Sequence, residues 1–269
     1  MQYFTTVARE NGSISLYISP GIGTDSITSI SYSTDNGKTW ITTSNQNNRS
    51  EYLVINVNVT TGDKVLWKGI ANRFSDSGND YYSSFRSTCY FDIKGNIMSL
   101  LYGDNYQNQT TLEEGANFSS LFYYDFAPGI CKVVNAKDLI LPATTLSNGC
   151  YYNMFYGCSS LVTVPELPAT TLAKSCYGYM FTDCVSLTTA PELPATTLAD
   201  YCYEWMFNGC TSLNYIKVMF TTIYQAYNAT LNWVKDVSPT GTFVKKSVAD
   251  LSTGNDGIPT GWTVETANE

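Results

Sequence analysis

The chain has 269 residues, of which 43% are apolar and 14% are charged, and it carries a net charge of −8 and no histidine. Such an acidic, weakly charged composition excludes the basic surface that nucleic acid or anionic lipid requires, so we expect no nucleic-acid partner. The absence of histidine excludes a Ser-His-Asp or Cys-His catalytic site but leaves carboxylate chemistry open.

The start of the chain, residues 1–6, has neither the basic nor the apolar run of an export signal. No apolar run in the sequence is long enough to cross a bilayer, so we expect no membrane insertion. The sequence therefore predicts a protein that is made in a cytoplasm without a signal peptide.

Residues 1–95 predict an antiparallel β-sandwich-like domain. Short β-rich runs alternate with turn signals at a spacing that is typical of all-β domains. Asn36-Gly37 predicts a tight hairpin, because both residue types accept positive φ values. The expected strands are 13–18, 26–32, 52–59, 64–70 and 87–93.

The hairpin carries Ser33-x-Asp35-x-Gly37-x-Thr39-Trp40, which resembles the Asp-box of sialidases and other β-propellers. The motif has two interpretations, a glycan-cleaving enzyme or a structural turn. In the turn interpretation the Asp35 side chain accepts bonds from backbone amides, Gly37 allows the bend and Trp40 packs. Propellers repeat the motif and this chain has one copy, which favours structural roles for Asp35, Gly37 and Trp40.

Residues 96–120, which contain Gly103-Asp104-Asn105 and Gly115, predict the junction between this domain and the start of an N-terminal cap. Beyond the junction, between residues 121 and 235, a sequence unit recurs with a step of 26 residues. Leu-Pro-Ala-Thr-Thr-Leu opens each clear copy, and two cysteines, a Met-Phe pair and a leucine keep the same step. The cysteine columns are Cys150, Cys176, Cys202 and Cys158, Cys184, Cys210.

Within one copy, Cys150, Met154, Phe155 and Cys158 lie at i, i+4, i+5 and i+8, which predicts a one-sided helical arc. Residues 162–164 are rich in β-branched side chains and predict a short strand. One such unit cannot bury its own apolar face, whereas stacked copies form a continuous core. The predicted fold class is therefore mixed α+β, with a β-sandwich-like domain followed by a short leucine-rich-repeat-like solenoid and a β-rich C-terminal cap.

The six column cysteines are interpreted as buried small apolar side chains that stack from copy to copy. An even number of cysteines also fits disulfides in a secreted protein, but a chain folded in a cytoplasm keeps its thiols reduced. There is no Cys-x2-Cys pair and no histidine, so we expect no metal site and no cofactor.

The Met-Phe pair, followed by a cysteine and then a leucine at steps of three, resembles the BspA-like (Treponema-type) leucine-rich repeats. The resemblance covers roughly residues 115–235 and implies a curved solenoid that serves binding or display. The step and the Leu-Pro-Ala-Thr-Thr-Leu segment look like the variant of gut Bacteroidales and their phages. Degenerate copies flank the clear ones, with Leu121-Phe122 and Cys131 before them and Asn232-Trp233 after them.

Residues 236–269 predict a C-terminal cap, because the last copy of a stack needs shielding from solvent. Two closing strands are expected, at 241–245 and 261–264, around a glycine-rich loop. The resulting domains are 1–95, 96–120, 121–235 and 236–269.

Positions that vary between copies are candidate binding residues, because packing does not constrain them. Tyr201 and Trp205 would share a helical face, and Tyr179 and Trp205 would lie side by side on neighbouring copies. Rigid aromatic side chains suit contact with a protein or a sugar. The alternative is that the rings pack against the N-terminal domain or another subunit. The candidates are Tyr152, Tyr179, Tyr201, Glu204 and Trp205.

No catalytic constellation is evident, because acidic residues such as Glu166 and Glu192 recur one step apart like solvated positions. We therefore predict a non-enzymatic phage virion protein, a fibre, tail or head decoration for structural scaffolding or host-surface recognition. Its expected partners are other virion proteins, further copies of itself in a homo-oligomer, and a host-surface glycan or protein. The alternatives are a bacterial cell-surface adhesin and a glycan-binding or glycan-cleaving protein.

Overall fold

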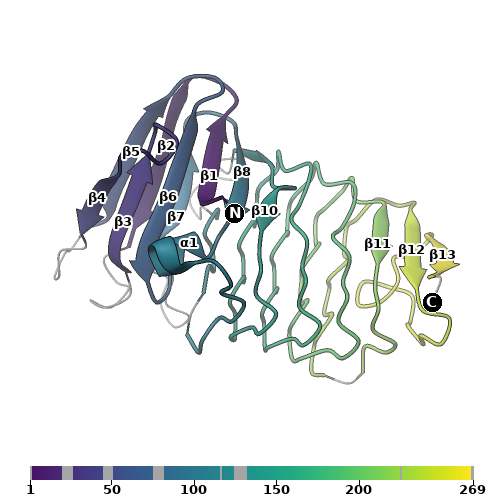
Figure 1. Cartoon of the computed structure of the whole chain (residues 1–269). Helices are drawn as coiled ribbons and strands as arrows, with labels where there is room; N and C mark the ends of the chain where they lie inside the picture. Colours follow the sequence, from purple (N-terminus) through teal and green to yellow (C-terminus); the bar gives the residue numbers. More distant parts are fainter. Residues whose placement is uncertain are drawn as a thin grey trace.

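The computed structural model describes residues 2–19, 27–44, 51–74, 82–115, 117–123, 132–224 and 226–267. The molecule is elongated, with the N-terminal β-strands at one end and a small sheet near the C-terminus at the other (Figure 1). Between them, successive passes of the chain lie side by side along the long axis. We call this middle part, residues 117–123, 132–224 and 226–237, the turn stack.

The N-terminal end is built from two β-sheets. Their strands are β1 (Phe4–Ala8), β2 (Gly12–Ile18), β3 (Ile27–Ser33), β4 (Ile41–Ser44), β5 (Leu53–Val59), β6 (Lys64–Ala71), β7 (Ser84–Ser87), β8 (Phe91–Asn96), β9 (Val133–Asn135) and β10 (Leu139–Ile140). The larger sheet has the order β10-β8-β1-β6-β3-β4, with β9 also paired to β8, and the smaller has the order β5-β2-β7. The two sheets therefore interleave strands that are distant in sequence.

The alternation of side chains explains how these sheets pack. In β5 every second residue is buried, at Ile55, Val57 and Val59, and the residues between them are exposed. Phe85 of the smaller sheet packs against the larger sheet, with ring centroids 5.3 Å from Phe4 and 5.1 Å from Trp67. An aromatic cluster thus joins the two sheets.

The strand predictions hold for most of this region and fail at three places. Strands β2, β3, β5 and β6 lie where the sequence predicts them, although Ser26 is outside the described residues. Strands β1 and β4 were not predicted. The expected strand 87–93 is wrong, since a turn separates β7 from β8, and in it Ser87 Oγ donates to the Cys89 carbonyl at 2.6 Å.

The turn stack begins at the edge of the larger sheet. After β8 the chain forms one helical turn, α1 (Ser99–Tyr102), and a 3-10 turn, η1 (Gly103–Asn105). Strands β9 and β10 then pair in parallel with β8. Isolated parallel bridges such as Asn135↔Thr163 continue this edge into the repeats. The stack is therefore a direct extension of the N-terminal sheet.

Within each copy, backbone amides alternate between two kinds of partner. Those of Tyr152 and Met154 donate to carbonyls three residues earlier, at 3.1 and 3.2 Å. Between them, the amides of Tyr151 and Asn153 donate to the next copy, at Cys176 and Gly178, with both distances 3.0 Å. In this segment of each copy, which we call its arc, half of the amides thus close turns, and the other half hold neighbouring copies together.

Left-handed backbone conformations recur at every fourth residue of these arcs. In the first clear copy they occur at Gly149, Asn153 and Gly157, with φ values of 63°, 57° and 72°. The equivalent residues of the later copies are Ser175, Tyr179, Asp183, Tyr201, Trp205, Gly209, Asn228, Asn232 and Asp236. A residue with positive φ cannot continue a right-handed helix, so each arc is a series of linked turns.

The predicted mixed α+β class with a leucine-rich-repeat-like solenoid is therefore wrong. The structure is 3% helical and 31% strand, nearly all-β, and its strands form several sheets, none of them closed or solenoidal. The i, i+4, i+8 spacing of Cys150, Met154 and Cys158 arises from four-residue turns rather than from helical periodicity. Residues 162–164 do not form the expected strand, and only the bridge at Thr163 remains.

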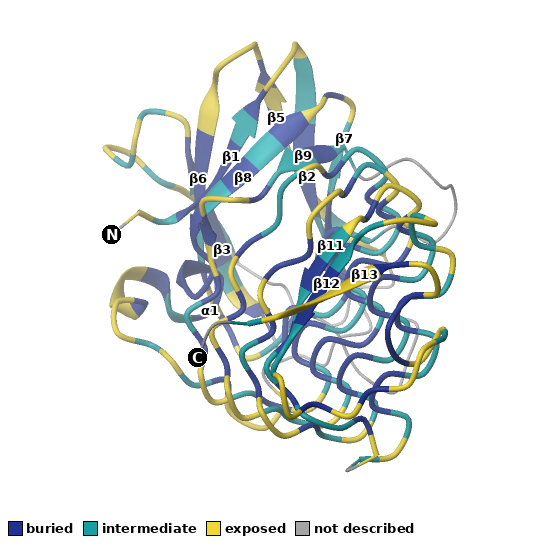
Figure 2. Cartoon of the chain, turned by 90° about the vertical axis from the view of Figure 1, so that its right-hand side faces the viewer, coloured by how far each residue is buried: buried dark blue, intermediate teal, exposed yellow. Residues whose placement is uncertain are grey.

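A small parallel sheet closes the other end of the stack. It contains β11 (Tyr215–Lys217), β12 (Thr242–Lys245) and β13 (Thr263–Thr266), in that order. The end-on view in Figure 2 shows β12 as mostly buried and β13 as exposed. Two tryptophan side chains connect the segments at this end by hydrogen bonds. Trp233 Nε1 donates to the Gly257 carbonyl at 2.9 Å, and Trp262 Nε1 donates to the Ser238 carbonyl at 2.7 Å.

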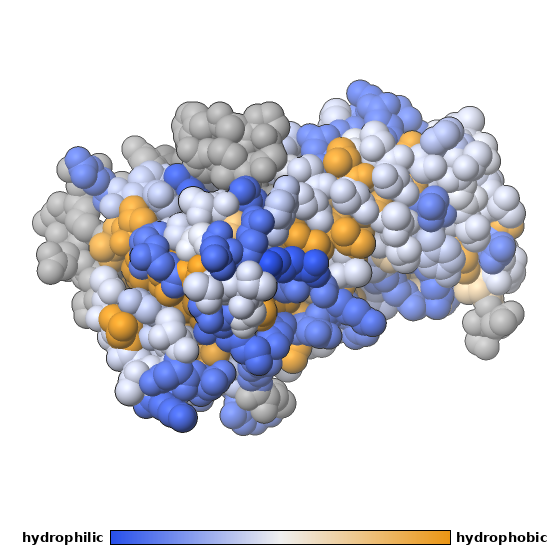
Figure 3. Space-filling model, turned by 90° about the horizontal axis from the view of Figure 1, so that it is seen from above, coloured by the Kyte–Doolittle hydropathy of each residue, from blue (hydrophilic) through white to orange (hydrophobic). Residues whose placement is uncertain are grey.

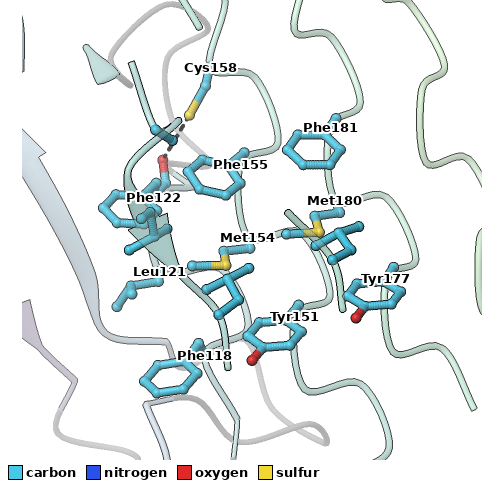
Figure 4. Close-up of a cluster of buried hydrophobic side chains, with 14 of the residues drawn as sticks. Phe118, Leu121, Phe122, Tyr151, Met154, Phe155, Cys158, Tyr177, Met180 and Phe181 are labelled. Atoms are coloured by element: carbon cyan, nitrogen blue, oxygen red, sulfur yellow. Dashed lines mark hydrogen bonds between the residues drawn. The ribbon is translucent and has the colours of Figure 1, made fainter. Parts of the chain in front are cut away.

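Columns of rings fill the interior of the stack. Figure 4 shows Phe122, Phe155 and Phe181 in one row, with methionines and Leu121 between them and a second row of rings. The Phe155 ring lies 5.1 Å from Phe122 and 5.5 Å from Phe181, tilted by 9° and 8°. Such stacking places a ring at the same depth in successive copies, which explains why the Met-Phe pair keeps the 26-residue step.

Candidate binding surface

The Asp-box sequence forms the turn between β3 and β4, and its side chains bond within the turn. Asp35 accepts bonds from the Thr39 hydroxyl at 2.6 Å, the Thr39 amide at 2.9 Å and the Ser33 hydroxyl at 2.7 Å. These bonds hold the pKa of Asp35 well below its usual value, the Thr39 hydroxyl contributing most. Gly37 adopts a φ of 85° there. The carboxylate is therefore engaged in the turn itself.

Trp40 packs beside this turn in a cluster with Tyr3 and Lys68. The Trp40 and Tyr3 rings meet edge to face at 5.0 Å, and Lys68 Nζ lies 4.2 Å from the centroid of the Trp40 ring. Asp104 accepts from Lys68 Nζ at 2.8 Å and from the Tyr3 hydroxyl at 2.7 Å. The Asp104 bond raises the pKa of Tyr3 to about 12. These side chains bond to one another and connect Tyr3, just before β1, to β6 and η1.

The column cysteines lie in the core of the stack. Burial raises the pKa of each free thiol in the two columns above its usual value, so these thiols stay protonated and unreactive. The free column cysteines are Cys150, Cys176, Cys184, Cys202 and Cys210. This state matches the expected apolar role.

Cys158 is the exception, because it is disulfide-bonded. The prediction that all six column cysteines are unbridged is therefore wrong at this position. Its Sγ lies 3.7 Å from the Phe122 carbonyl, at the start of the stack (Figure 4). Cys131, placed by the sequence in the degenerate copy before the stack, lies outside the described residues. The bond at Cys158 could not be predicted from the repeat, because this residue occupies the same column position as the free cysteines Cys184 and Cys210.

Three of the predicted binding residues form a row on the outside of the stack, which we call the aromatic row: Tyr152, Tyr179 and Trp205. The Tyr152 and Tyr179 rings lie 5.3 Å apart, and the Tyr179 and Trp205 rings stack at 5.9 Å with a tilt of 7°. Lys235 Nζ lies 5.5 Å from the Trp205 ring at the end of the row. Gly178 makes the row possible, since a Cβ there would lie 3.0 Å from the Tyr152 ring.

Glu204 lies among the tyrosines of the aromatic row. Burial raises the pKa of its carboxyl above the usual value. The same carboxylate, together with burial as the larger cause, raises the pKa of Tyr152 and brings that of Tyr179 to about 12. The negative charge of Glu204 thus disfavours ionisation of both phenols, in the same direction as their burial.

Tyr201 belongs to a second aromatic contact. The prediction that it shares a helical face with Trp205 is wrong, because no helix forms there. Its ring instead meets Tyr227 edge to face at 5.3 Å, and Lys174 Nζ lies 5.6 Å from its centroid. The aromatic row and this contact both belong to the arcs of the repeats.

Sequence reasoning missed the two most exposed aromatic residues of this region, Tyr224 and Tyr227, at 74% and 64% exposure. They border a cavity of about 500 Å3. The repeat pattern gave no clear signal for them, because residues 219–224, one step after Leu193–Leu198, keep only Thr222 of the hexapeptide. The sequence signal that could have found them is a pair of aromatic residues inside a segment that departs from the repeat.

A second, larger hollow of about 940 Å3 lies elsewhere on the repeats. It is lined mainly by prolines, threonines and the acidic residues Glu166 and Glu192. Both glutamates are exposed, and Glu192 pairs with Lys217 at 3.0 Å. On the face seen in Figure 3, apolar residues form small groups among polar ones. The residues that line this hollow include no aromatic side chain.

Within the described ranges, no three His, Cys, Asp or Glu residues are grouped closely enough to hold a metal ion. Over the same residues, no helix is both long and apolar enough to cross a bilayer. No protein-family model, curated protein or solved structure matches this chain. Its function must therefore be argued from its own surface.

Proposed function

We propose that this chain is a non-enzymatic recognition module, carried as an appendage of a phage particle, that contacts the host surface through the aromatic row. Recognition is supported by bulky side chains at positions whose backbone conformation is unfavourable for them. Tyr179, Tyr201 and Trp205 have φ values of 56°, 57° and 54°. Bulky side chains rarely adopt this conformation, and it costs about 1–3 kcal/mol at each residue.

The fold itself does not require aromatic residues at these positions. The residue one step before Tyr179 is Asn153, and two steps before Tyr201 it is Gly149, both of which accept positive φ readily. Glycine or asparagine would therefore serve the turns at lower cost. Strained residues concentrate at sites of function, and two of these three, Tyr179 and Trp205, place stacked rings near the Glu204 carboxylate.

A double substitution, Tyr179→Asn with Trp205→Gly, tests recognition. Relief of backbone strain should offset the lost ring stacking, about 0.5–1.5 kcal/mol per pair, so we expect the melting temperature to change little. Binding of the labelled full chain to host envelopes should weaken at least tenfold. Tyr90→Ala, at an exposed tyrosine of the N-terminal part, is the matched control. A large drop in melting temperature with unchanged binding would assign the row a packing role only.

The assignment to a phage particle is supported by the resemblance of the repeat, whose hexapeptide and step look like those of gut Bacteroidales and their phages. In a particle, the partners would be other virion proteins and further copies of this chain. Mass spectrometry of density-purified particles and of washed host envelopes tests this assignment. Stoichiometric peptides in the particles are expected, whereas peptides in the envelopes alone would make the chain a bacterial surface adhesin.

A further inference from the structure

The cavity beside Tyr224 and Tyr227 has a built interior. Its floor is formed by buried side chains, including Ala229 and Thr230 at 1% and 3% exposure. Thr230 is fixed there, because its hydroxyl donates to the Asp256 carbonyl at 2.7 Å. A volume of about 500 Å3 lies within the range of small-molecule sites and suffices for one or two sugar rings.

Two carboxylates line the same cavity, and the backbone holds each of them in place. Asp200 Oδ1 accepts from the Tyr227 amide at 2.8 Å, and Asp256 Oδ1 accepts from the Asn232 amide at 2.6 Å. A carboxylate has two oxygens with about four acceptor positions. One oxygen of each group thus fixes its orientation, and the other can accept bonds from a ligand.

The tyrosines supply the complementary apolar surface. Tyr227 is positioned by an edge-to-face contact with the Tyr201 ring at 5.3 Å, and the Tyr201 amide donates to the Tyr227 carbonyl at 3.0 Å. Tyr224 extends into solvent beside it. In the aromatic row the ring faces stack on one another, whereas these two rings are largely exposed, so a ligand can lie on them.

From this geometry we infer that the cavity binds a neutral carbohydrate. A sugar ring presents C–H groups on one face, which pack on an aromatic ring, and hydroxyl groups at its edge, which donate to fixed carboxylates. The inference goes beyond the proposed function, because it assigns a second recognition site in this cavity, apart from the aromatic row, and names the class of ligand that the cavity takes. An anionic sugar is disfavoured, because it would place a third negative charge beside Asp200 and Asp256.

Saturation-transfer difference NMR on the full chain tests the inference. The probes are glucose, galactose, mannose and N-acetylglucosamine, with sialyllactose as an anionic sugar and tetramethylammonium as an organic cation. We expect a saturable signal from at least one neutral sugar. Tyr224→Ala and Asp256→Asn should each weaken that binding at least tenfold, whereas Tyr90→Ala should leave it unchanged. Tyr224 is too exposed for its truncation to disturb the fold.

A signal from sialyllactose or tetramethylammonium alone would overturn the inference, and so would neutral-sugar binding that survives both substitutions. The absence of saturable binding by any neutral sugar would also overturn it. Envelope binding by the same preparations separates this result from the proposed function. A chain that binds envelopes but no sugar retains recognition and loses the carbohydrate site, whereas a chain that binds neither loses both.

Discussion

Asp35 shows how a motif that resembles part of an enzyme family acts as a local structural device. Three bonds from Thr39 and Ser33 stabilise its ionised form in the folded state. A carboxyl whose pKa is lowered by folding contributes stability above its unfolded pKa, which is 3.8, and that contribution is lost as the pH falls toward the folded value. The stabilising effect is therefore fully present at neutral pH and fades below about pH 4.

We expect Asp35→Asn to lower the urea midpoint at neutral pH and to flatten the loss of stability between about pH 4 and pH 3. The amide cannot carry the charge that the Thr39 and Ser33 donors stabilise. Thr39→Val removes the largest single contribution to the lowered pKa and should give the same change to a smaller degree. Parallel curves for the parent and Asp35→Asn across the acid range would contradict this account.

The bond at Cys158 gives a second prediction at the scale of one residue. A disulfide restricts the unfolded chain, and its removal typically costs about 2–4 kcal/mol. Reducing agent should therefore lower the melting temperature, and Cys158→Ser should lower it similarly and abolish the effect of the reductant. Cys184→Ala, in the same column but at a free thiol, should keep the response to reductant. An identical melting curve with and without reductant would show that the bond adds no stability.

For the arcs of the turn stack, the positions of the side chains could be predicted from the sequence, whereas the backbone conformation could not. The 26-residue step, the buried columns and the stacking of copies follow from the repeated Cys, Met and Phe residues, since only side chains at equal depth need to recur. The backbone does not follow from them, because apolar residues four apart fit both a helix and a series of four-residue turns. Gly149, Asn153 and Gly157 mark the turns by residue type, but Tyr179 and Trp205 occupy the same conformation and hide the signal.

The candidate binding surface could be predicted from the sequence to a similar extent. Variation between copies pointed to the aromatic row and Glu204, whose side chains are half-buried on the arcs, and their role in binding stays a prediction. It did not identify Tyr224 and Tyr227, because their segment has lost most of the hexapeptide and is hard to align with the other copies. The separation of Tyr201 from Trp205 could not be predicted without the correct backbone.

Gly157 tests the backbone of the arcs directly. Its φ is 72°, and a Cβ added there would meet no atom within 4 Å, so substitution changes the backbone energy alone. We expect Gly157→Ala to destabilise the chain by about 1–2 kcal/mol, the cost of a left-handed alanine, and Gly157→Asn to cost less. In a helix the same alanine would stabilise by about 0.5–1 kcal/mol. The sign of the change in denaturant midpoint therefore distinguishes turns from helix.

On the scale of the whole molecule, one apolar core runs from the N-terminal sheets into the stack. Phe122 connects them, because its ring lies 5.9 Å from Phe85 in the smaller sheet and 5.1 Å from Phe155 in the first clear copy. Parallel pairing of β9 and β10 with β8 adds a backbone connection at the same place. The two parts should therefore unfold together, although each has its own sheet or ring columns.

Phe122→Ala should break this coupling. Truncation of a buried phenylalanine costs about 3–5 kcal/mol, and here the loss falls on the contact between the two parts rather than within either one. We expect the amides of β6 and those around Phe207 to exchange with the same free energy of opening in the parent. In the variant, the two regions should open with different free energies and exchange at different rates. Phe243→Ala, at the closing sheet, should destabilise the far end without separating the N-terminal sheets from the first copies. Common opening of both parts in Phe122→Ala would mean that the β8, β9 and β10 ladder alone transmits cooperativity along the molecule.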